Sequence, residues 1–270
     1  MRNALREELS KIDLDRAESE IIDFIRREVK ASGAKGVVIG LSGGVDSSVA
    51  TALCAKSLGG DRVLSLIMPT YFTPRSDLED AEGLAADLGI ERRVIGIDAI
   101  CDRIYGSVGA DQSNPANRIP MANVRARVRM ILLYYFANSE NRLVVGTGDR
   151  SEILLGYFTK YGDGGADLLP IAHLYKTQVR MMAAHLGLPR RIAEKEASPQ
   201  LYPGHRAVDE LPLDYDRLDP ILYGLFDRGL RPEEVAELSG TPLEIVEGIL
   251  RRCSASAHKR RPPPSLRPID

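Results

Sequence analysis

Hydrophobic positions in the first half of the chain alternate between short continuous runs and longer stretches with helical spacing. The short runs are rich in β-branched residues and cover residues 36–41, 62–68, 92–97 and 142–147. Between them, apolar residues recur with the period of a helix in residues 45–58, 76–88 and 117–140. Strands that alternate with helices predict an α/β fold, in which a mainly parallel, Rossmann-like sheet carries helices on both faces.

Two helical stretches carry a continuous apolar face, in residues 17–29 and 121–136. Such a face is buried either in the core of the chain or in a helix-lined dimer interface, and the pattern alone leaves both open. At the start of the helix predicted for 76–88, Ser76 and Glu79 have the spacing of a capping box.

After residue 155 the alternation of strands and helices stops. Residues 197–213 are irregular and rich in proline, and the C-terminal part is helical again. We find neither internal repeats nor a long linker. We therefore expect a single domain over residues 1–270, with a helical N-terminal segment (1–34), an α/β core (35–190) and an irregular and helical C-terminal extension (191–270).

Composition narrows the class of protein. Hydrophobic residues make up 44% of the chain and charged residues 27%, as in globular proteins, and the formal net charge is −2. This charge gives no general attraction to nucleic acids or anionic membranes, and no apolar run is long enough to span a bilayer. A cytoplasmic protein with neither a nucleic-acid nor a membrane partner is expected. Cys54, Cys101 and Cys253 are too far apart to indicate a disulfide framework or a zinc site.

The segment from Ser42 to Ser48 carries the clearest chemical signal. Its sequence, SGGVDSS, follows the apolar run at 37–41 and precedes a predicted helix. The first amides of a helix have no intrahelical acceptor, so phosphate binds there, and glycines allow a close approach. Asp46 is suited to hold a divalent cation. Residues 40–48, 69–75 and 146–152 all follow predicted strands, and should therefore converge at one edge of the sheet.

The SGGVDS segment lacks the Gly-Lys-Ser/Thr of the commoner phosphate loop and instead resembles the loop of the PP-loop ATP pyrophosphatases. Further strings, in order, are NVRARVRM (123–130), VVGTGDRSE (144–152), GYFTKYGDGGAD (156–167), LYKTQV (174–179) and HKRRP (258–262). Together they closely resemble the NAD synthetase family over roughly residues 15–265. This resemblance implies an adenine nucleotide α hydrolase-like fold.

The resemblance also implies roles for individual residues. The ATP polyphosphate would be held by Gly40, Leu41, Ser42, Gly43, Gly44, Val45, Asp46 and Ser47, with further ATP contacts from Thr147, Lys176 and Ser198. Mg²⁺ would be bound by Asp46 and Glu152. Deamido-NAD would be contacted by Arg127, Tyr157, Lys160, Asp167, His258 and Lys259.

The implied reaction is the ATP-dependent amidation of deamido-NAD to NAD by ammonia, through an adenylated nicotinate, with release of AMP and pyrophosphate. Asp46 and Lys176 would act on the phosphates, and Asp163 is our candidate for accepting a proton from ammonium. The family also implies a homodimer. Only about 35 residues precede the first predicted strand, fewer than a glutaminase domain needs. Free ammonia is therefore the expected donor, although a separate glutaminase subunit stays possible.

Simpler interpretations of several residues remain open. Glu152 has capping-box spacing from Asp149, Lys176 has the pattern of a solvated charge, and Tyr157 that of a core residue. Residues 162–165 suit either a plain loop or an active-site lid, and 258–261 suit a solvated tail. The sequence departs from the family pattern around Ser198 and at His205, where contacts with the adenine are implied.

Alternative functions also remain open. One is a different PP-loop enzyme, either an adenylating amidase or a tRNA-modifying enzyme. Another is a helix-turn-helix nucleic-acid binder, because residues 231–252 predict two helices joined by a short turn. In the second of these helices Glu244 and Glu247 lie near the start, where DNA phosphates would approach, which disfavours that function.

Overall fold

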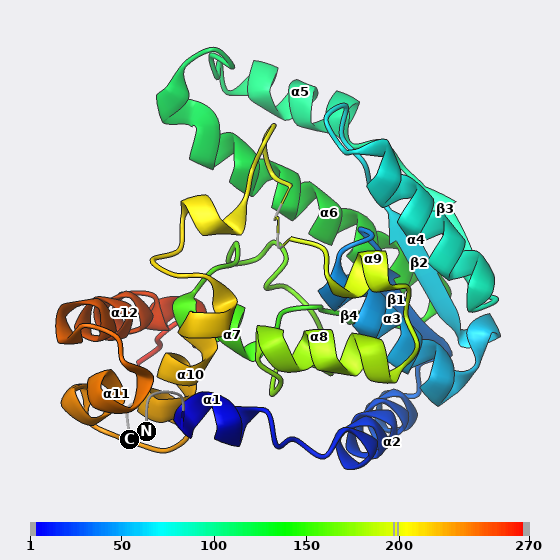
Figure 1. Ribbon diagram of the computed structural model, residues 1–270. Helices are drawn as coiled ribbons and strands as arrows, with labels where there is room; N and C mark the ends of the chain where they lie inside the picture. The colour runs from blue at the N-terminus through cyan, green and yellow to red at the C-terminus, as the bar shows by residue number, and fades with distance from the viewer. Residues whose placement is uncertain (1–3, 197, 199, 267–270) are drawn as a thin grey trace.

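A parallel sheet forms the centre of the protein. The computed structural model describes residues 4–196, 198 and 200–266, and its strands are β1 (Gly36–Gly40), β2 (Val63–Ile67), β3 (Glu91–Val94) and β4 (Arg142–Val145). They pair in parallel in the order β3-β2-β1-β4 (Figure 1). Val37 lies opposite Val63 on one side and Leu143 on the other. The four predicted strands are thus confirmed, and each is slightly shorter than its apolar run.

Helices account for most of the remaining chain. The α-helices are α1 (Ala4–Leu9), α2 (Leu14–Ser32), α3 (Val45–Leu58), α4 (Arg75–Asp87), α5 (Asp98–Ser107), α6 (Arg118–Glu140), α7 (Arg150–Leu155), α8 (Lys176–His185), α9 (Arg190–Ala193), α10 (Tyr215–Phe226), α11 (Pro232–Ser239) and α12 (Leu243–Ala255). Short 3₁₀ turns are η1 (Gly60–Arg62), η2 (Pro115–Asn117), η3 (Ala207–Asp209) and η4 (Ala257–Lys259). The predicted capping box of α4 is wrong. Its N-cap is Pro74, which makes no side-chain cap hydrogen bond, and Glu79 instead pairs with Arg75.

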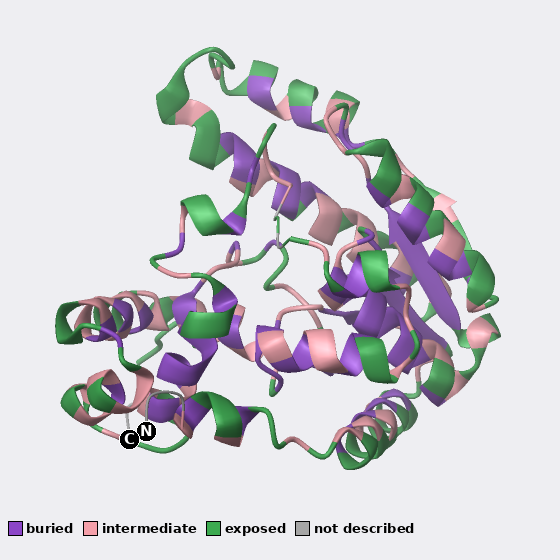
Figure 2. Ribbon diagram, in the orientation of Figure 1, coloured by how far each residue is buried: buried purple, intermediate pink, exposed green. Residues whose placement is uncertain are grey.

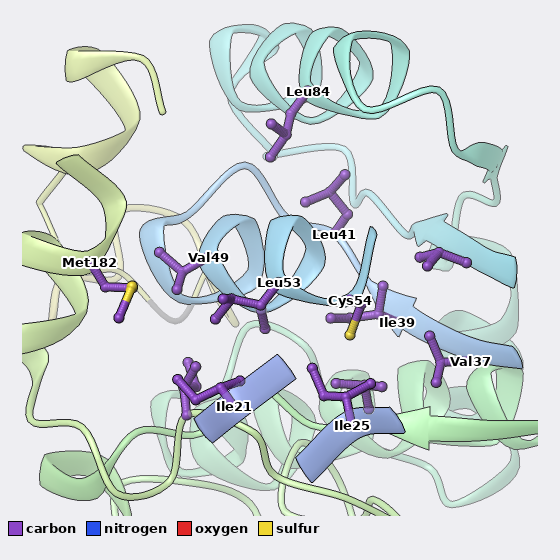
Figure 3. Close-up of a cluster of buried hydrophobic side chains, with 14 of the residues drawn as sticks. Ile21, Ile25, Val37, Ile39, Leu41, Val49, Leu53, Cys54, Leu84 and Met182 are labelled. Carbon is purple, nitrogen blue, oxygen red and sulfur yellow. The ribbon is translucent and has the colours of Figure 1, made fainter. Parts of the chain in front are cut away.

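Each face of the sheet packs against its own set of helices, because side chains alternate along every strand. Val37 and Ile39 of β1 enter a core that also contains residues of α2, α3, α4 and α8. Figure 3 shows Ile21, Ile25 and Leu53 meeting in that core. Val38 faces the opposite side, where α5 and α6 supply Cys101, Tyr105, Met121 and Val128. The predicted α/β fold with helices on both faces is confirmed.

The two amphipathic stretches differ in their burial. In α2 the apolar face is core, with Ile21 and Ile25 almost fully buried. In α6, Met121 and Val128 are buried, whereas Ile131 and Tyr135 are 57% and 64% exposed. The exposed outer side of α6 is visible beside the buried interior in Figure 2. The stripe on α6 therefore divides between the core and an uncovered surface.

A separate helical cluster brings the two ends of the chain together. Leu5 and Leu9 of α1 pack with residues of α10, α11 and α12 around Leu218 and Leu222. Figure 1 shows α1 beside α10 and α11. The helix pair predicted within 231–252 is present as α11 and α12, and its buried residues Val235, Val246 and Ile249 belong to this cluster. Within the described residues, no helix is both long and apolar enough to cross a bilayer.

The order of the strands creates a crevice between β1 and β4. The chain leaves β1 toward β2 and β3 on one side, and returns to β4 on the other. At such a switch point the loops that follow the two central strands separate, and ligands bind between them. Here those loops are 41–44 and 146–149, which directly follow β1 and β4.

Burial of α3 against the sheet should dominate stability. Leu53 is fully buried in the α3 core, so Leu53→Ala should lower the free energy of unfolding by about 2–5 kcal/mol through lost contacts and a cavity. Chemical denaturation measures this change. Leu243→Ala, at a leucine that is 39% exposed, is the matched control and should cost far less. Equal losses for both variants would contradict the assignment of the core.

Candidate active site

A cavity of about 260 Å³ lies at the carboxyl ends of β1 and β4. Its wall includes most of the predicted ATP loop, namely Gly40, Leu41, Ser42, Gly44, Val45, Asp46 and Ser47. Thr147, Glu152 and Lys176 approach it from the side of β4. The prediction that loops after separate strands converge is therefore confirmed by the fold.

The loop before α3 is shaped for an anion. Gly43 has a φ of +78°, and a Cβ atom on it would lie 2.3 Å from the carbonyl oxygen of Asp77, so a side chain is excluded there. The Ser47 hydroxyl accepts from the backbone N–H of Ser42 at 3.2 Å and donates to the carbonyl of Gly44 at 3.1 Å. Gly44 caps α3 without a side-chain hydrogen bond, which leaves the first amides of the helix for a phosphate.

Lys176 is the centre of a charged cluster. Its Nζ lies 2.6 Å from Asp46 Oδ2, 3.0 Å from Asp149 Oδ2 and 2.8 Å from Glu152 Oε1. The side chains of Lys176 and Asp149 are fully buried. Lys176 begins α8, and Asp46 lies in the first turn of α3. Asp149 is the N-cap of α7, and Glu152 lies in the first turn of that helix. The cluster therefore joins three helix N-termini.

Burial and mutual repulsion raise the pKa values of Asp149 and Glu152 in this cluster. Burial, opposed by the charge of Lys176 and supported by that of Asp46, raises the pKa of Asp149 to about 7. Burial raises the pKa of Glu152 as well. Burial opposes the charged form of Lys176, but Asp149, Asp46 and Glu152 outweigh it and raise the pKa of Lys176 well above its usual value. The ammonium is therefore protonated at neutral pH, and three acidic side chains share its single positive charge.

The residues present fit the implied Mg²⁺. Asp46 Oδ1 is buried and has no hydrogen-bond partner in the described structure. The excess of carboxylates over ammonium groups also favours an added cation. Among the described residues, no group of three or more His, Cys, Asp or Glu side chains is arranged to hold a metal ion. Mg²⁺ commonly binds to one or two carboxylates together with substrate phosphates, which suits Asp46 and Glu152.

Glu152 forms the capping box that its spacing from Asp149 predicts, and it also lines the cavity. Its backbone N–H donates to Asp149 Oδ1 at 2.8 Å, and its Oε2 accepts from the N–H of Asp149 at 3.4 Å, so the capping box of α7 is present. Its other oxygen, Oε1, contacts Lys176. The cap thus fixes the carboxylate that faces the cavity.

Three further predicted residues line the cavity, namely Tyr157, Asp163 and Ser198. Tyr157 is half-buried, and its hydroxyl lies 3.3 Å from Nε2 of His205. Asp163 is exposed, and its Oδ1 accepts from the backbone N–H of Thr159 at 2.9 Å, which also gives it a loop-forming role. The Ser198 hydroxyl donates to the carbonyl of His205.

Most of the predicted deamido-NAD residues lie outside this cavity. Four of them form a basic cluster: Arg127, Lys160, His258 and Lys259. Arg127 donates to the carbonyl of Lys160 at 3.3 Å, and Lys160 Nζ donates to that of His258 at 3.1 Å. Lys259 Nζ donates to the carbonyls of Gly156 and Phe158 at 2.7 and 2.8 Å, which attaches the basic cluster to the end of α7.

Asp167 stands apart from the basic cluster. Its Oδ2 accepts from the backbone N–H of Val144 at 2.7 Å, and its Oδ1 accepts from the hydroxyl of Tyr134 at 3.0 Å. These bonds hold the loop that contains Asp167 against β4.

In the C-terminal tail, Arg260 follows Lys259 and donates to the carbonyls of Ile153 and Leu154 at the end of α7. The interpretation of 258–261 as a fully solvated tail is therefore wrong at this position.

Sequence reasoning missed several residues of the site. Arg129 lines the cavity from α6 and donates to the carbonyl of Met68 at 3.1 Å, and burial lowers its pKa. Its alternation with Arg125 and Arg127 gave no sign of which would face inward. Lys195 Nζ donates to the carbonyl of Gly43 at 2.8 Å and contacts Asp77 and Asp80 at 2.9 and 2.6 Å. No local motif marks that lysine, because its partners lie more than a hundred residues away.

Comparison with known proteins gives one consistent result. The family model described as NAD synthase matches residues 18–263. A curated NH₃-dependent NAD⁺ synthetase of Hyperthermus butylicus is 50% identical, over 97% of this chain and 94% of its own length. An NMN synthetase structure from Francisella tularensis has a TM-score of 0.81 and 31% identity, over 96% of this chain and 99% of that one. An NH₃-dependent NAD synthetase structure from Campylobacter jejuni has a TM-score of 0.78 and 30% identity, over 95% and 100%.

Replacing Lys176 should lower the stability of the protein, because the acidic side chains around its ammonium repel one another. Lys176→Met leaves three carboxylates without their cation, so we expect a loss of unfolding free energy of about 3–5 kcal/mol, as for other broken buried pairs. Burial already raises the pKa values of Asp149 and Glu152 in the wild type, and removing the ammonium should raise them further. Stability of the variant should therefore fall more steeply than that of the wild type as the pH rises above the unfolded carboxyl pKa of about 4. Denaturation in the presence of a chelator measures both effects.

The control is Lys56→Met, at a lysine whose side chain is 55% exposed and pairs with Glu18. It should change stability little and keep the pH dependence of the wild type. If Lys176→Met were as stable as the control at every pH, the charged cluster would not contribute to the free energy of unfolding as proposed.

Proposed function

Since the chain belongs to the NAD synthase family, we propose that it catalyses the ammonia- and ATP-dependent amidation of deamido-NAD to NAD. One observation supports this most strongly: Lys176, with its three carboxylates, lies beside an anion-binding loop at the switch point of the sheet. This arrangement combines phosphate binding, a fixed positive charge and two carboxylates suited to Mg²⁺ in one cavity.

The chemistry requires activation, because a carboxylate is a poor acyl donor. An oxygen of the nicotinate carboxylate attacks the α-phosphorus of ATP, and pyrophosphate leaves with the electrons of the broken P–O bond. The resulting mixed anhydride is attacked at its carbonyl carbon by ammonia, AMP leaves, and a proton passes from nitrogen to a base. No covalent bond to the protein forms, so positioning and electrostatic stabilisation supply the rate.

The protein's groups have separate tasks in this scheme. The first amides of α3 and the loop 40–47 hold the polyphosphate, with Thr147 and Ser198 as further ATP contacts. Lys176 faces the negative charge that accumulates on the phosphates. Bound by Asp46 and Glu152, Mg²⁺ would supply further charge neutralisation at the phosphate oxygens. Asp163, exposed at the cavity, accepts the proton released from ammonium.

The second substrate is assigned to the neighbouring surface. In the basic cluster, Arg127, Lys160 and Lys259 supply positive charge for the pyrophosphate of deamido-NAD. His258 is a further proposed contact. Tyr157 lines the cavity, and its ring would stack on the nicotinate. Asp167 completes the proposed contacts and also anchors its loop to β4.

Ammonia is the proposed nitrogen donor. A glutaminase needs an accessible, reactive thiolate. All three cysteines of the chain are buried, and burial raises the pKa of Cys54 to about 12 and that of Cys253 to about 11. None of them is suited to attack glutamine.

The reaction itself is the first test of the proposal. Purified protein with deamido-NAD, ATP, ammonium and Mg²⁺ should form NAD, AMP and pyrophosphate in equal amounts, as resolved by chromatography. Nicotinate mononucleotide is the comparison substrate, because one structural neighbour is an NMN synthetase. A preference for the mononucleotide would replace deamido-NAD as the proposed substrate. Release of ADP and phosphate would refute the proposed mechanism.

Loss of a carboxylate from the proposed metal site should slow the reaction. We expect Glu152→Gln and Asp46→Asn to reduce kcat by about two or more orders of magnitude, the scale of losing one electrostatic element of an active site. The matched control Glu79→Gln alters an exposed pair with Arg75 on α4 and should keep the rate. If Glu152→Gln also kept it, the residue would serve only as a helix cap.

We further propose a homodimer formed through α6. Ile131 and Tyr135 expose apolar surface on that helix, and Ile131→Glu should shift the sedimentation coefficient from dimer to monomer, because a buried charge disfavours the interface. Leu243→Glu, at an exposed leucine at the start of α12, is the control and should remain dimeric. A fully active wild-type monomer would contradict the proposal.

A further inference from the structure

Asp219 is a fully buried carboxylate that takes no part in the scheme above. It lies in α10, within the helical cluster, and has an exposed fraction of 0%. Burying an ionised carboxylate is costly unless its oxygens receive hydrogen bonds. Burial raises the pKa of Asp219 to about 6, so the group is largely ionised at neutral pH. A buried, ionised carboxylate of this kind needs hydrogen-bond donors in fixed positions.

Its donors come from the beginnings of two other helices. Asp219 Oδ1 accepts from the Ser151 hydroxyl at 2.7 Å, and Oδ2 accepts from the backbone N–H of Thr177 at 2.8 Å. Ser151 Oγ in turn accepts from the backbone N–H of Lys176 at 3.0 Å. Two backbone amides at the start of α8 thus depend on one carboxylate. The amide of Thr177 binds Asp219 directly, and the amide of Lys176 binds it through the Ser151 hydroxyl.

These bonds reach both members of the Lys176–Glu152 pair. Ser151 directly precedes Glu152 in α7, and Thr177 directly follows Lys176 in α8. The separation of 2.8 Å between Lys176 Nζ and Glu152 Oε1 therefore depends on how α7 and α8 are held together at this point. Asp219 does not line the cavity, so its influence acts through backbone position.

We propose that Asp219 is a positioning residue, which through Ser151 holds the first residue of α8 so that Lys176 faces both the phosphate loop and Glu152. The inference rests on the proposed function for its kinetic test. The C-terminal helical cluster then contributes to the active site in two ways. Tyr215 of α10 lines the cavity, and Asp219 of the same helix sets the place of the ammonium from behind.

The test compares removal of the carboxylate with its conservative replacement. Asp219→Ala should lower kcat at least tenfold and change the KM for deamido-NAD less than threefold, because the misplaced ammonium affects the phosphate charge and not the second substrate. Asp219→Asn keeps an acceptor for Thr177 and can donate to Ser151. It should remain within about threefold of the wild-type kcat, since geometry and not charge is the essential property.

Ser151→Ala is the second variant, and it should lower kcat in the same direction. Since both residues act through one chain of hydrogen bonds, the double variant should be no slower than Asp219→Ala alone. Asp216→Ala is the matched control, because Asp216 lies on the same helix and reaches Arg180 of α8 at 3.8 Å from an exposed position. It should leave kcat and KM unchanged.

Crystal structures of the Ser151→Ala and Asp219→Asn variants provide a readout independent of turnover. We expect Lys176 Nζ to lose its contact with Glu152 in the former and to keep it in the latter. An unmoved Lys176 in Ser151→Ala, a full kcat in either alanine variant, or an Asp219→Asn variant as slow as Asp219→Ala would each overturn the inference. A wild type inactive on every carboxylate substrate would refute the proposed function, and the structures would still decide the role of Asp219.

Discussion

The contact between the buried ammonium of Lys176 and the carboxylates of Asp46, Asp149 and Glu152 is the constraint on which the site depends. Bringing these four charges out of water is costly, and mutual attraction offsets that cost only when their geometry is held closely. The geometry comes from three helix N-termini, each fixed by a different device: the glycine loop before α3, the capping box of α7, and the Ser151 and Asp219 bonds at α8. A change in any of them alters the distances on which the other charges depend.

The parallel sheet explains why these helix ends meet. With β1 between β2 and β4, the loops after β1 and β4 separate and leave the crevice in which the cavity lies. The α/β part alone supplies the phosphate loop and the acids of α7. The helical cluster adds the support behind α8, and it includes α1 near the N-terminus together with α10, α11 and α12. The two cores are therefore joined at the active site, where a small displacement has the largest chemical effect.

Much of this arrangement could be predicted from sequence, for physical reasons that differ between residues. The strands and the loop at 42–48 were recognisable because their signals are local: apolar runs, glycines and the start of a helix. The partners of Lys176 lie 24 to 130 residues away along the chain, and no periodicity reports such a distance. The roles of Asp219 and Lys195 could not be predicted for the same reason. Arg129 could not be singled out because Arg125, Arg127 and Arg129 alternate along α6, and the sequence does not show which of them faces the cavity. The predicted Ser76 capping box is wrong because the N-cap of α4 is Pro74, two residues before the position that the motif implies.

A crystal structure of the protein with Mg²⁺ and a non-hydrolysable ATP analogue would test the account most directly. The account predicts that Asp46 and Glu152 bind the metal ion while Lys176 keeps its buried contact with Asp149 and turns its remaining N–H donors to the phosphates. Polyphosphate bound away from the first turn of α3, or Lys176 detached from Asp149 and pointing away from the phosphates, would contradict it.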